Sequence, residues 1–335
     1  MKHTHNKQRV GIIFGGESAE HEVSIASAQN VIAAIDTVHF EAVPIYVTKQ
    51  GAWLASTPEA LPKAEPPKHS VQLDLLKNID IVFPLIHGSR GEDGSLQGLL
   101  ELLALPYVGC NIVSSASAMD KEVSKRLLRD AGLAVTDFVV VRAAQTVDAD
   151  AILSQLGLPV FVKPANAGSS LGISKVTHKN DLRKATTHAL GFDNKILIER
   201  AVHGSEVECA VLGNANPKVS VPGRIAVANG FYDYTAKYTE GLATLEVPAR
   251  LSAKMNQAVQ QTALKAFTAL GCTGMARVDM FITSNNTIIV NEINTIPGFT
   301  KFSMYPKLWQ ASGLLYTELI TKLLHLAVER FKDRI

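Results

Sequence analysis

Four polar residues stand at alternate positions in two apolar segments near the C-terminus. One segment contains Arg277 and Asp279, and the other contains Glu292 and Asn294. Residues two apart on a strand point to the same face, so a hairpin of these segments would bring all four side chains to one place. Oxygen atoms of Asp, Glu and Asn are ligands that Mg²⁺ prefers, usually completed by substrate phosphates and water. An arginine beside them can stabilise a phosphoryl group during transfer.

The alternative for this cluster is a structural ion pair of Arg277 with Asp279 or Glu292 at a sheet edge. For a single pair, that would be the better interpretation. Two alternating polar pairs inside apolar strands, however, are costly to bury without a ligand. The pattern therefore favours a site for a cation and a phosphate.

A loop of small residues forms a second candidate site. It follows an apolar strand at 160–163 and reads PANAGSS from 164 to 170. Its backbone N–H groups and the hydroxyls of Ser169 and Ser170 can hold phosphate oxygens, and Lys163 adds a positive charge. The loop matches neither GxxxxGK[ST] nor GxGxxG, and the glycine pair at 15–16 also lacks the dinucleotide spacing. A P-loop NTPase and a dehydrogenase are therefore disfavoured.

The elements that must position these residues begin with a parallel α/β unit. Apolar segments bounded by Gly and Pro read as buried strands between helical stretches, at 10–14, 43–47 and 79–85. Polar loops follow two of them, at 15–20 and 87–94. Open α/β sheets place ligands at such loops, so both are candidate sites.

The texture changes in the rest of the chain. The spacing of apolar residues predicts a helix over 119–131, where a new unit begins. Short strands with Gly-rich turns then predict an antiparallel sheet from 160–163, 173–176, 195–199, 207–212 and 219–221. Residues 229–246 are polar and aromatic, as expected of a functional loop or lid. The last elements expected are a helix at 252–270, strands at 274–283 and 287–294, and an amphipathic helix at 312–330.

Composition excludes several classes of protein. The chain has 335 residues, 47% hydrophobic and 19% charged, which indicates a globular protein of two or three packed units. A net charge of +2 provides no strong field for nucleic acid or an anionic membrane. Three separated cysteines, Cys110, Cys209 and Cys272, suit a reducing compartment, and no run approaches the roughly 18 apolar residues of a membrane span. We expect a soluble cytoplasmic enzyme.

Taken together, the motifs resemble those of the D-alanine–D-alanine ligases of the ATP-grasp superfamily, over about residues 10–330. The blocks that carry the resemblance occur in the family's order: GGESAEHEVS at 15–24, HGSRGEDGSLQG at 87–98, MDK at 119–121, KPANAGSS at 163–170 and NEINTIPGFT at 291–300. The resemblance implies that ATP phosphorylates the carboxylate of a first D-alanine and that the amine of a second attacks the acyl phosphate. It also implies a role in peptidoglycan precursor synthesis, two Mg²⁺ or Mn²⁺ ions and a homodimer.

The resemblance assigns roles to individual residues. Metal ligands would be Asp279, Glu292 and Asn294. Phosphate contacts would come from Lys121, Lys163, Ser170 and Lys237, and nucleoside contacts from Glu199, Val202, Glu206 and Phe281. Arg277 and the N–H of Gly298 would hold the oxygen of the tetrahedral intermediate. The D-alanine contacts would be Glu20, His87, Ser303 and Met304.

The resemblance implies that a lid and its tyrosine decide the second substrate. Tyr238 is expected to close a hydrogen-bond network with Ser169 and Glu20, and several relatives with other products carry arginine in place of Met304. Tyr238 together with Met304 therefore favours D-alanine. A ligase that forms D-Ala-D-Ser or D-Ala-D-lactate, and a nucleotide sensor without turnover, remain the alternatives.

The fold class expected is mixed α/β and α+β: an ATP-grasp fold preceded by an N-terminal parallel α/β domain. We expect an N-terminal domain at 1–117, a central domain at 118–208 and a C-terminal domain at 209–335. ATP would lie between the last two sheets.

Overall fold

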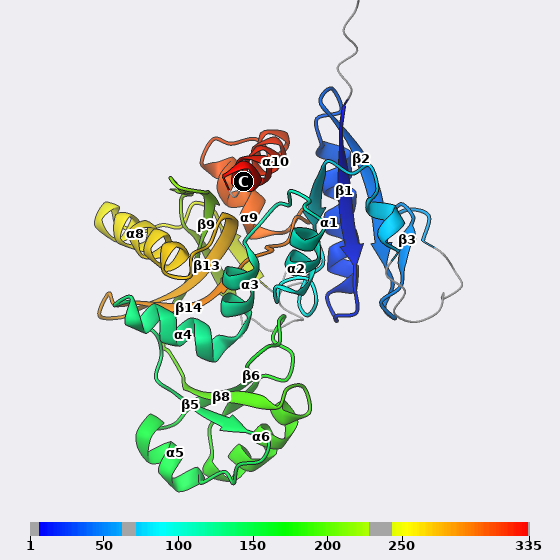
Figure 1. Cartoon of the computed structure of the whole chain (residues 1–335). Helices are drawn as coiled ribbons and strands as arrows, with labels where there is room; N and C mark the ends of the chain where they lie inside the picture. The colour runs from blue at the N-terminus through cyan, green and yellow to red at the C-terminus, as the bar shows by residue number, and fades with distance from the viewer. Residues whose placement is uncertain (1–6, 62–71, 228–242, 334–335) are drawn as a thin grey trace, which may run out of the picture.

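Three separate β-sheets form the framework of the protein. The computed structural model describes residues 7–61, 72–227 and 243–333. In Figure 1 the N-terminal sheet, in blue, and the central sheet, in green, lie at two ends of the molecule, and the C-terminal sheet lies between helices α8 and α9. No helix within these described ranges is both long and apolar enough to cross a membrane.

The N-terminal sheet is largely parallel, as the sequence predicts. Its strand order is β3-β2-β1-β4, and only β3 is antiparallel to its neighbour. Val10, Ile12 and Phe14 of β1 pack with α1 and α10, whereas Ile13 belongs to the core on the opposite face. The bounds are β1 Gln8–Gly15, α1 His21–Ala34, β2 Phe40–Val47, β3 Trp53–Ala55, a 3₁₀ turn Leu73–Leu76, β4 Ile81–Pro84 and α2 Ser95–Leu102.

The central sheet is antiparallel, with the order β5-β8-β6-β7. Val160, Val162, Ile196 and Ile198 pack beneath α5 and α6, so the alternate residues Phe161, Lys163 and Glu199 face the other way. The bounds are β5 Phe138–Arg142, α5 Ala149–Leu156, β6 Val160–Pro164, β7 Ser174–Val176, a 3₁₀ turn Lys179–Asp181, α6 Leu182–Leu190 and β8 Lys195–Arg200.

The C-terminal sheet has the order β12-β11-β9-β13-β14, with β10 beside β9. Its apolar residues at even positions of β13, Ala276, Val278 and Met280, pack with Val259 and Phe267 of α8. The bounds are β9 Gly204–Gly213, β10 Lys218–Val219, β11 Gly223–Val227, β12 Ala243–Glu246, α8 Ala253–Ala269, β13 Gly274–Thr283, β14 Ile288–Asn294, α9 Met304–Ala311 and α10 Tyr316–Lys332.

The prediction that all strands from 160 to 221 form one antiparallel sheet is wrong. The chain leaves the central sheet after β8, and β9 and β10 pair in the C-terminal sheet. Strand spacing alone does not reveal this change, because both sheets are antiparallel and each strand has a buried face. The expected domain boundary at 208 falls within β9, which is continuous from Gly204 to Gly213.

The helix expected over 119–131 is α4, Lys121–Asp130, and Met119 is instead the last residue of a separate helix, α3 Ile112–Met119. The break occurs at Asp120, whose carboxylate accepts hydrogen bonds from the N–H groups of Glu122, at 3.0 Å, and Val123, at 3.1 Å. An aspartate cap of this kind starts a new helix. The expected lid also contains a strand, β12, and the closing helix α10 starts at Tyr316, after the separate helix α9.

Candidate active site

The four alternating polar residues converge on one face of the β13–β14 hairpin. Arg277 lies opposite Asn294 and Asp279 opposite Glu292 in the register. A β-bulge follows, because Met280 pairs with Val290 and leaves Asn291 without a partner residue on β13. The predicted hairpin and the convergence of its polar side chains are therefore confirmed.

Arg277 forms a buried ion-pair group with two carboxylates. Its Nε and Nη2 atoms donate to the two oxygens of Asp279, each at 2.7 Å, and Nε lies 3.0 Å from Oε2 of Glu208. Burial by itself opposes the charge of Arg277, but the two carboxylates outweigh it and hold its pKa well above the usual value. The ion pair with Asp279 that the sequence offers as an alternative is present, on the wall of a cavity that Arg277 helps to line.

Glu208 is a residue that the sequence reasoning missed. It lies opposite Asp279 on β9 and is only 2% exposed. The signal was present in the sequence: Glu206 and Glu208 alternate with the apolar Val207 and Cys209, as Arg277 and Asp279 alternate in β13. Such a strand has one polar face, and the pairing of β9 with β13 joins that face to the site.

The set Asp279, Glu292 and Asn294 has the chemistry of a site for a hard cation. It offers two carboxylates and an amide oxygen, and the amide oxygen of Asn294 also accepts from the N–H of Ile296 at 3.1 Å. Within the described ranges, no group of three or more His, Cys, Asp or Glu is arranged to hold a metal. The donor set fits Mg²⁺ or Mn²⁺ when other oxygens, from substrate phosphates and water, complete it.

The small-residue loop has an unusual backbone at Ser169 and Ser170. Ser169 and Ser170 have φ angles of 48° and 59°, so two consecutive residues are left-handed. Non-glycine residues rarely adopt this conformation, and it commonly marks functional sites. The hydroxyl oxygen of Ser169 is buried, with no hydrogen-bond partner among the described residues.

Lys121 is tied to this loop at two points. Its backbone N–H donates to the carbonyl of Ala165 at 3.0 Å, and its Nζ donates to the carbonyl of Ala167 at 2.7 Å. Because Asp120 caps α4, Lys121 is the first residue of that helix. The predicted phosphate contacts Lys121, Ser169 and Ser170 therefore lie together.

Two cavities meet at the loop. The smaller, of about 120 Å³, reaches from the hairpin to the N-terminal domain, and the larger, of about 370 Å³, lies between the central and C-terminal sheets. The larger is within the range of small-ligand pockets. Residues that line both are Lys121, Ala167, Gly168, Ser169 and Glu292. A ligand in the larger cavity therefore reaches the smaller one at the small-residue loop and Glu292.

The larger cavity brings together the residues expected to contact the nucleotide. Its lining includes Lys163, Ser170, Glu199, Val202, Glu206 and Phe281. Glu199 is 2% exposed and forms ion pairs with Lys163, at 2.8 Å, and with Lys125, at 3.3 Å. Burial by itself opposes the charge of Glu199, but the two lysines outweigh it and lower its pKa. Lys125 was not singled out in the sequence.

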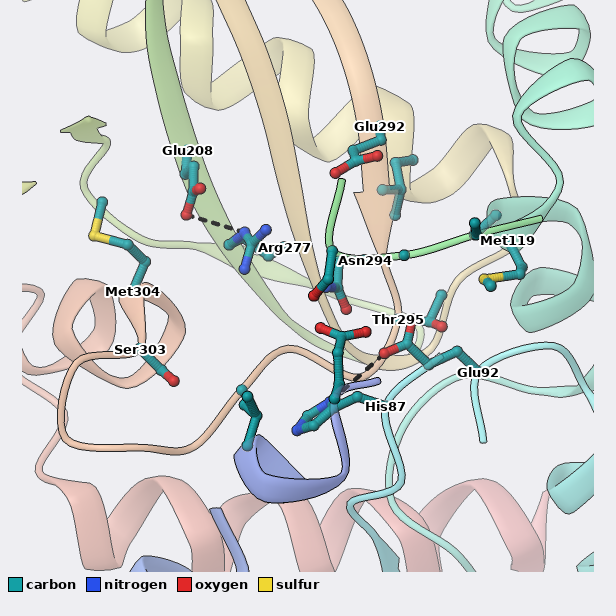
Figure 2. A pocket seen from close by; sticks show the side chains of 18 of the residues that line it. His87, Glu92, Met119, Glu208, Arg277, Glu292, Asn294, Thr295, Ser303 and Met304 are labelled. Atoms are coloured by element: carbon teal, nitrogen blue, oxygen red, sulfur yellow. Dashed lines mark ion pairs between the residues drawn. The ribbon is translucent and has the colours of Figure 1, made fainter. Parts of the chain in front are cut away.

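The smaller cavity contains the residues expected to contact D-alanine. It is lined by Glu20, His87, Gly298, Ser303 and Met304. Figure 2 shows His87 and Glu92 on one side of the cavity, with Ser303 and Met304 on another and Arg277, Glu292 and Asn294 on the hairpin. A Cβ atom built on Gly168 would lie 2.9 Å from a carboxylate oxygen of Glu20, so the small-residue loop approaches the N-terminal domain closely. Lys237 and Tyr238, and with them most of the predicted lid, fall outside the described residues.

His87 is a buried titratable group beside Glu92. Its Nδ1 lies 3.0 Å from the carbonyl of Ile296 and 3.6 Å from Oε1 of Glu92, and its Nε2 lies 3.4 Å from the hydroxyl of Ser27. Burial opposes the imidazolium, but Glu92 and the charge of Glu20 outweigh it and raise the pKa of His87. Burial also raises the pKa of Glu92, although His87 opposes this.

These two pKa shifts predict how stability depends on pH. With both pKa values raised, the folded state binds more protons than the unfolded state, so the free energy of unfolding falls as pH rises. The part due to His87 is fully present below pH 6.5, the ordinary value, and is lost as pH rises through the raised pKa. Above pH 6.5, the free energy of unfolding of the unmodified protein should therefore fall with pH more steeply than that of His87→Asn. The difference between the two slopes should be up to about 1.4 kcal/mol per pH unit. Urea denaturation over a pH series measures both slopes. The exposed His178→Asn is the control, and equal slopes for all three proteins would contradict the prediction.

Comparison with known proteins agrees with this site. The family model "D-ala D-ala ligase N-terminus" matches residues 9–110, and "D-ala D-ala ligase C-terminus" matches residues 127–325. D-alanine–D-alanine ligase A of Escherichia coli K12 is 48% identical, over 97% of this chain and 96% of the relative.

Solved structures share the fold over nearly the whole chain. The D-alanine–D-alanine ligase of Coxiella burnetii has a TM-score of 0.85 and 37% identity, over 98% of this chain and 96% of that one. The VanG D-Ala:D-Ser ligase of Enterococcus faecalis has a TM-score of 0.82 and 35% identity, over 96% of this chain and 100% of that one. The D-alanine–D-alanine ligase of Bacillus anthracis complexed with ATP has a TM-score of 0.81 and 30% identity, over 98% of this chain and 100% of that one. The expected ATP-grasp fold is confirmed by these neighbours. Because the two family models together match most of the chain and contain residues of the site, and because the similarity to the relatives spans the chain, this protein belongs to the D-alanine–D-alanine ligase family.

Proposed function

We propose that this protein joins two D-alanines into D-alanyl-D-alanine with ATP as co-substrate, for the synthesis of peptidoglycan precursors in the cytoplasm. The observation that carries the proposal is the meeting of two cavities at the phosphate loop and Glu292. One cavity has the size and lining for a nucleotide, and the other has acidic and hydroxyl groups for an amino acid. Because the two reactants are held next to each other, an intermediate formed between them can react further without leaving the site.

The reaction has two steps. A carboxylate oxygen of the first D-alanine takes the γ-phosphoryl group of ATP, and ADP leaves. The amine of the second D-alanine then attacks the acyl carbon, loses a proton, and inorganic phosphate departs with the acyl oxygen. The first step is needed because a carboxylate is a poor electrophile until its oxygen becomes part of a phosphate leaving group.

The residues divide between these steps. Lys121, Lys163, Lys237 and the loop at Ser169 and Ser170 hold phosphate oxygens, and Glu199, Val202, Glu206 and Phe281 hold the nucleoside. Glu20 and His87 bind the first D-alanine, whereas Ser303 and Met304 bind the second. Arg277 and the N–H of Gly298 stabilise the oxygen of the tetrahedral intermediate. Tyr238 closes a network with Ser169 and Glu20.

Two divalent cations, Mg²⁺ or Mn²⁺, would be held by Asp279, Glu292 and Asn294. When bound, they neutralise the charge that develops on the phosphoryl oxygens during transfer. The donor chemistry of the hairpin supports this assignment.

D-Ala-D-Ser is the second candidate product, because the VanG D-Ala:D-Ser ligase is 35% identical to this chain. D-alanine is favoured as second substrate because the relative from Escherichia coli K12, named for D-alanine, is 48% identical and because Met304 is an apolar wall of the smaller cavity. We also propose that the chain forms a homodimer and that the C-terminal domain begins at about residue 204, where β9 starts.

The test is to mix the purified protein with ATP, Mg²⁺ and D-alanine. The dipeptide, ADP and phosphate should appear in equal amounts, and phosphate release should depend on D-alanine. D-serine and D-lactate added as competitors identify the preferred second substrate by mass spectrometry. Phosphate release without any dipeptide, depsipeptide or mixed product would reject the proposed ligation.

A further inference from the structure

A buried lysine outside both cavities connects the two sheets that enclose the larger one. Lys125 lies on α4 and is 1% exposed. Its Nζ lies 3.3 Å from Oε1 of Glu199, on the central sheet, and donates to the carbonyl of Asn291, on the C-terminal sheet, at 3.1 Å. Glu199 and Asn291 line the larger cavity, whereas Lys125 lies behind them.

The contact with Asn291 is made at the β-bulge. Asp279 pairs with Glu292 and Met280 pairs with Val290, so Asn291 has no partner residue on β13. A bulge leaves backbone groups without ladder partners, and a buried carbonyl without a donor is costly. Asn291 and Glu292, on either side of the step in register, both line the larger cavity. By donating to Asn291, Lys125 stabilises the backbone that presents Glu292.

The contact with Glu199 orients a residue of the nucleotide cavity. Lys163 holds one carboxylate oxygen of Glu199 and Lys125 faces the other, so the plane of this carboxylate is held from two sides. With Lys163 alone, the buried carboxylate would lose one of its two cations and could rotate.

We propose that Lys125 is a positioning residue for the nucleotide: it holds Glu199 and the bulge at Asn291 in the relative placement that ATP requires. It touches no substrate and acts through these two neighbours. This inference rests on the proposed function, since it takes the larger cavity as the nucleotide site.

The test uses full-length Lys125→Met, which keeps most of the side-chain volume but removes the charge and the donor. Loss of a charge-assisted hydrogen bond should raise the KM for ATP, and the Kd for ADP measured by calorimetry with EDTA present, about 10- to 100-fold. The KM for D-alanine at saturating ATP should stay within twofold. A purely structural role would lower the melting temperature or kcat without this selective change in nucleotide affinity.

Two further variants keep the test decisive. Lys184→Met, in the same central unit but exposed on α6, is the matched control and should behave as the unmodified protein. Lys125→Arg keeps the charge, but its planar group cannot occupy the same point between Glu199 and Asn291, so its KM for ATP should rise about threefold to tenfold. If Lys125→Met does not fold, Lys125→Arg decides.

The inference is overturned if folded Lys125→Met, or Lys125→Arg in its place, has a KM for ATP and a Kd for ADP within twofold of the unmodified protein. It is also overturned if Lys184→Met changes them equally. Failure of the proposed function looks different, because the unmodified protein would then form no product from ATP and D-alanine.

Discussion

Replacing Arg277 by lysine should lower kcat for dipeptide formation by about 100- to 1000-fold, because a planar guanidinium donates from several fixed N–H groups and an ammonium does not. In the folded protein two of those groups are taken by Asp279, each at 2.7 Å, which fixes the plane of the guanidinium on the cavity wall. A lysine keeps the positive charge between Asp279 and Glu208, so the protein should remain folded. Stopped-flow or steady-state assays of phosphate release measure the loss in kcat.

Arg277→Met removes the positive charge that Arg277→Lys keeps, so the two variants together separate the effect of charge from that of guanidinium geometry. It leaves Asp279 and Glu208 buried without their cation, and breaking such a buried pair costs about 3 to 5 kcal/mol of stability. Its melting temperature should therefore fall well below that of Arg277→Lys. Arg250→Lys is the control, since the side chain of Arg250 is 92% exposed. A folded Arg277→Lys with kcat within tenfold of the unmodified enzyme would show that the guanidinium does not stabilise the intermediate.

Glu292→Gln should lower kcat by about 100-fold or more and raise the Mg²⁺ concentration needed for half-maximal activity. The substitution keeps the shape of the side chain but removes one of two carboxylates in the donor set, and a hard cation binds charged oxygens more strongly than amide oxygens. Titration of activity with Mg²⁺ and with Mn²⁺ measures both effects, and removal of metal by EDTA should abolish activity in the unmodified protein.

The matched control for this substitution is Glu59→Gln, because Glu59 is exposed in a loop of the N-terminal domain. It should show unchanged kcat and an unchanged Mg²⁺ requirement. If Glu292→Gln loses activity but needs no more Mg²⁺ than the unmodified enzyme, Glu292 acts by some means other than holding the cation, and the metal assignment on the hairpin is wrong.

Short-range patterns predicted the parts of the site that depend on few neighbours. The alternation at Arg277 and Asp279, and at Glu292 and Asn294, predicted a shared face because the period of a strand is two residues and these strands are adjacent in the chain. The parallel N-terminal sheet was predicted from apolar segments that alternate with helical stretches. The helix predicted at 252–270 is also present, since α8 runs from Ala253 to Ala269 between its caps Ser252 and Leu270.

The errors arose where one strand or helix pattern fits two arrangements. The strands at 195–199 and 207–212 have similar apolar alternation, yet they belong to different sheets. The helix predicted from 119 starts at Lys121, because Met119 continues the apolar period of α4 although the carboxylate of Asp120 caps the helix after it.

By itself, the sequence determined the family motifs, the small-residue loop and the polar faces of the last two strands, because each depends on residues that are close along the chain. Only the tertiary structure decided that Glu208 joins Arg277 from β9 and that Lys125 reaches both Glu199 and Asn291. Lys125 and Asn291 are separated by 166 positions. Contacts of this kind depend on which sheets and helices pack together. That choice is made by the burial of apolar faces over the whole chain, which no local pattern records.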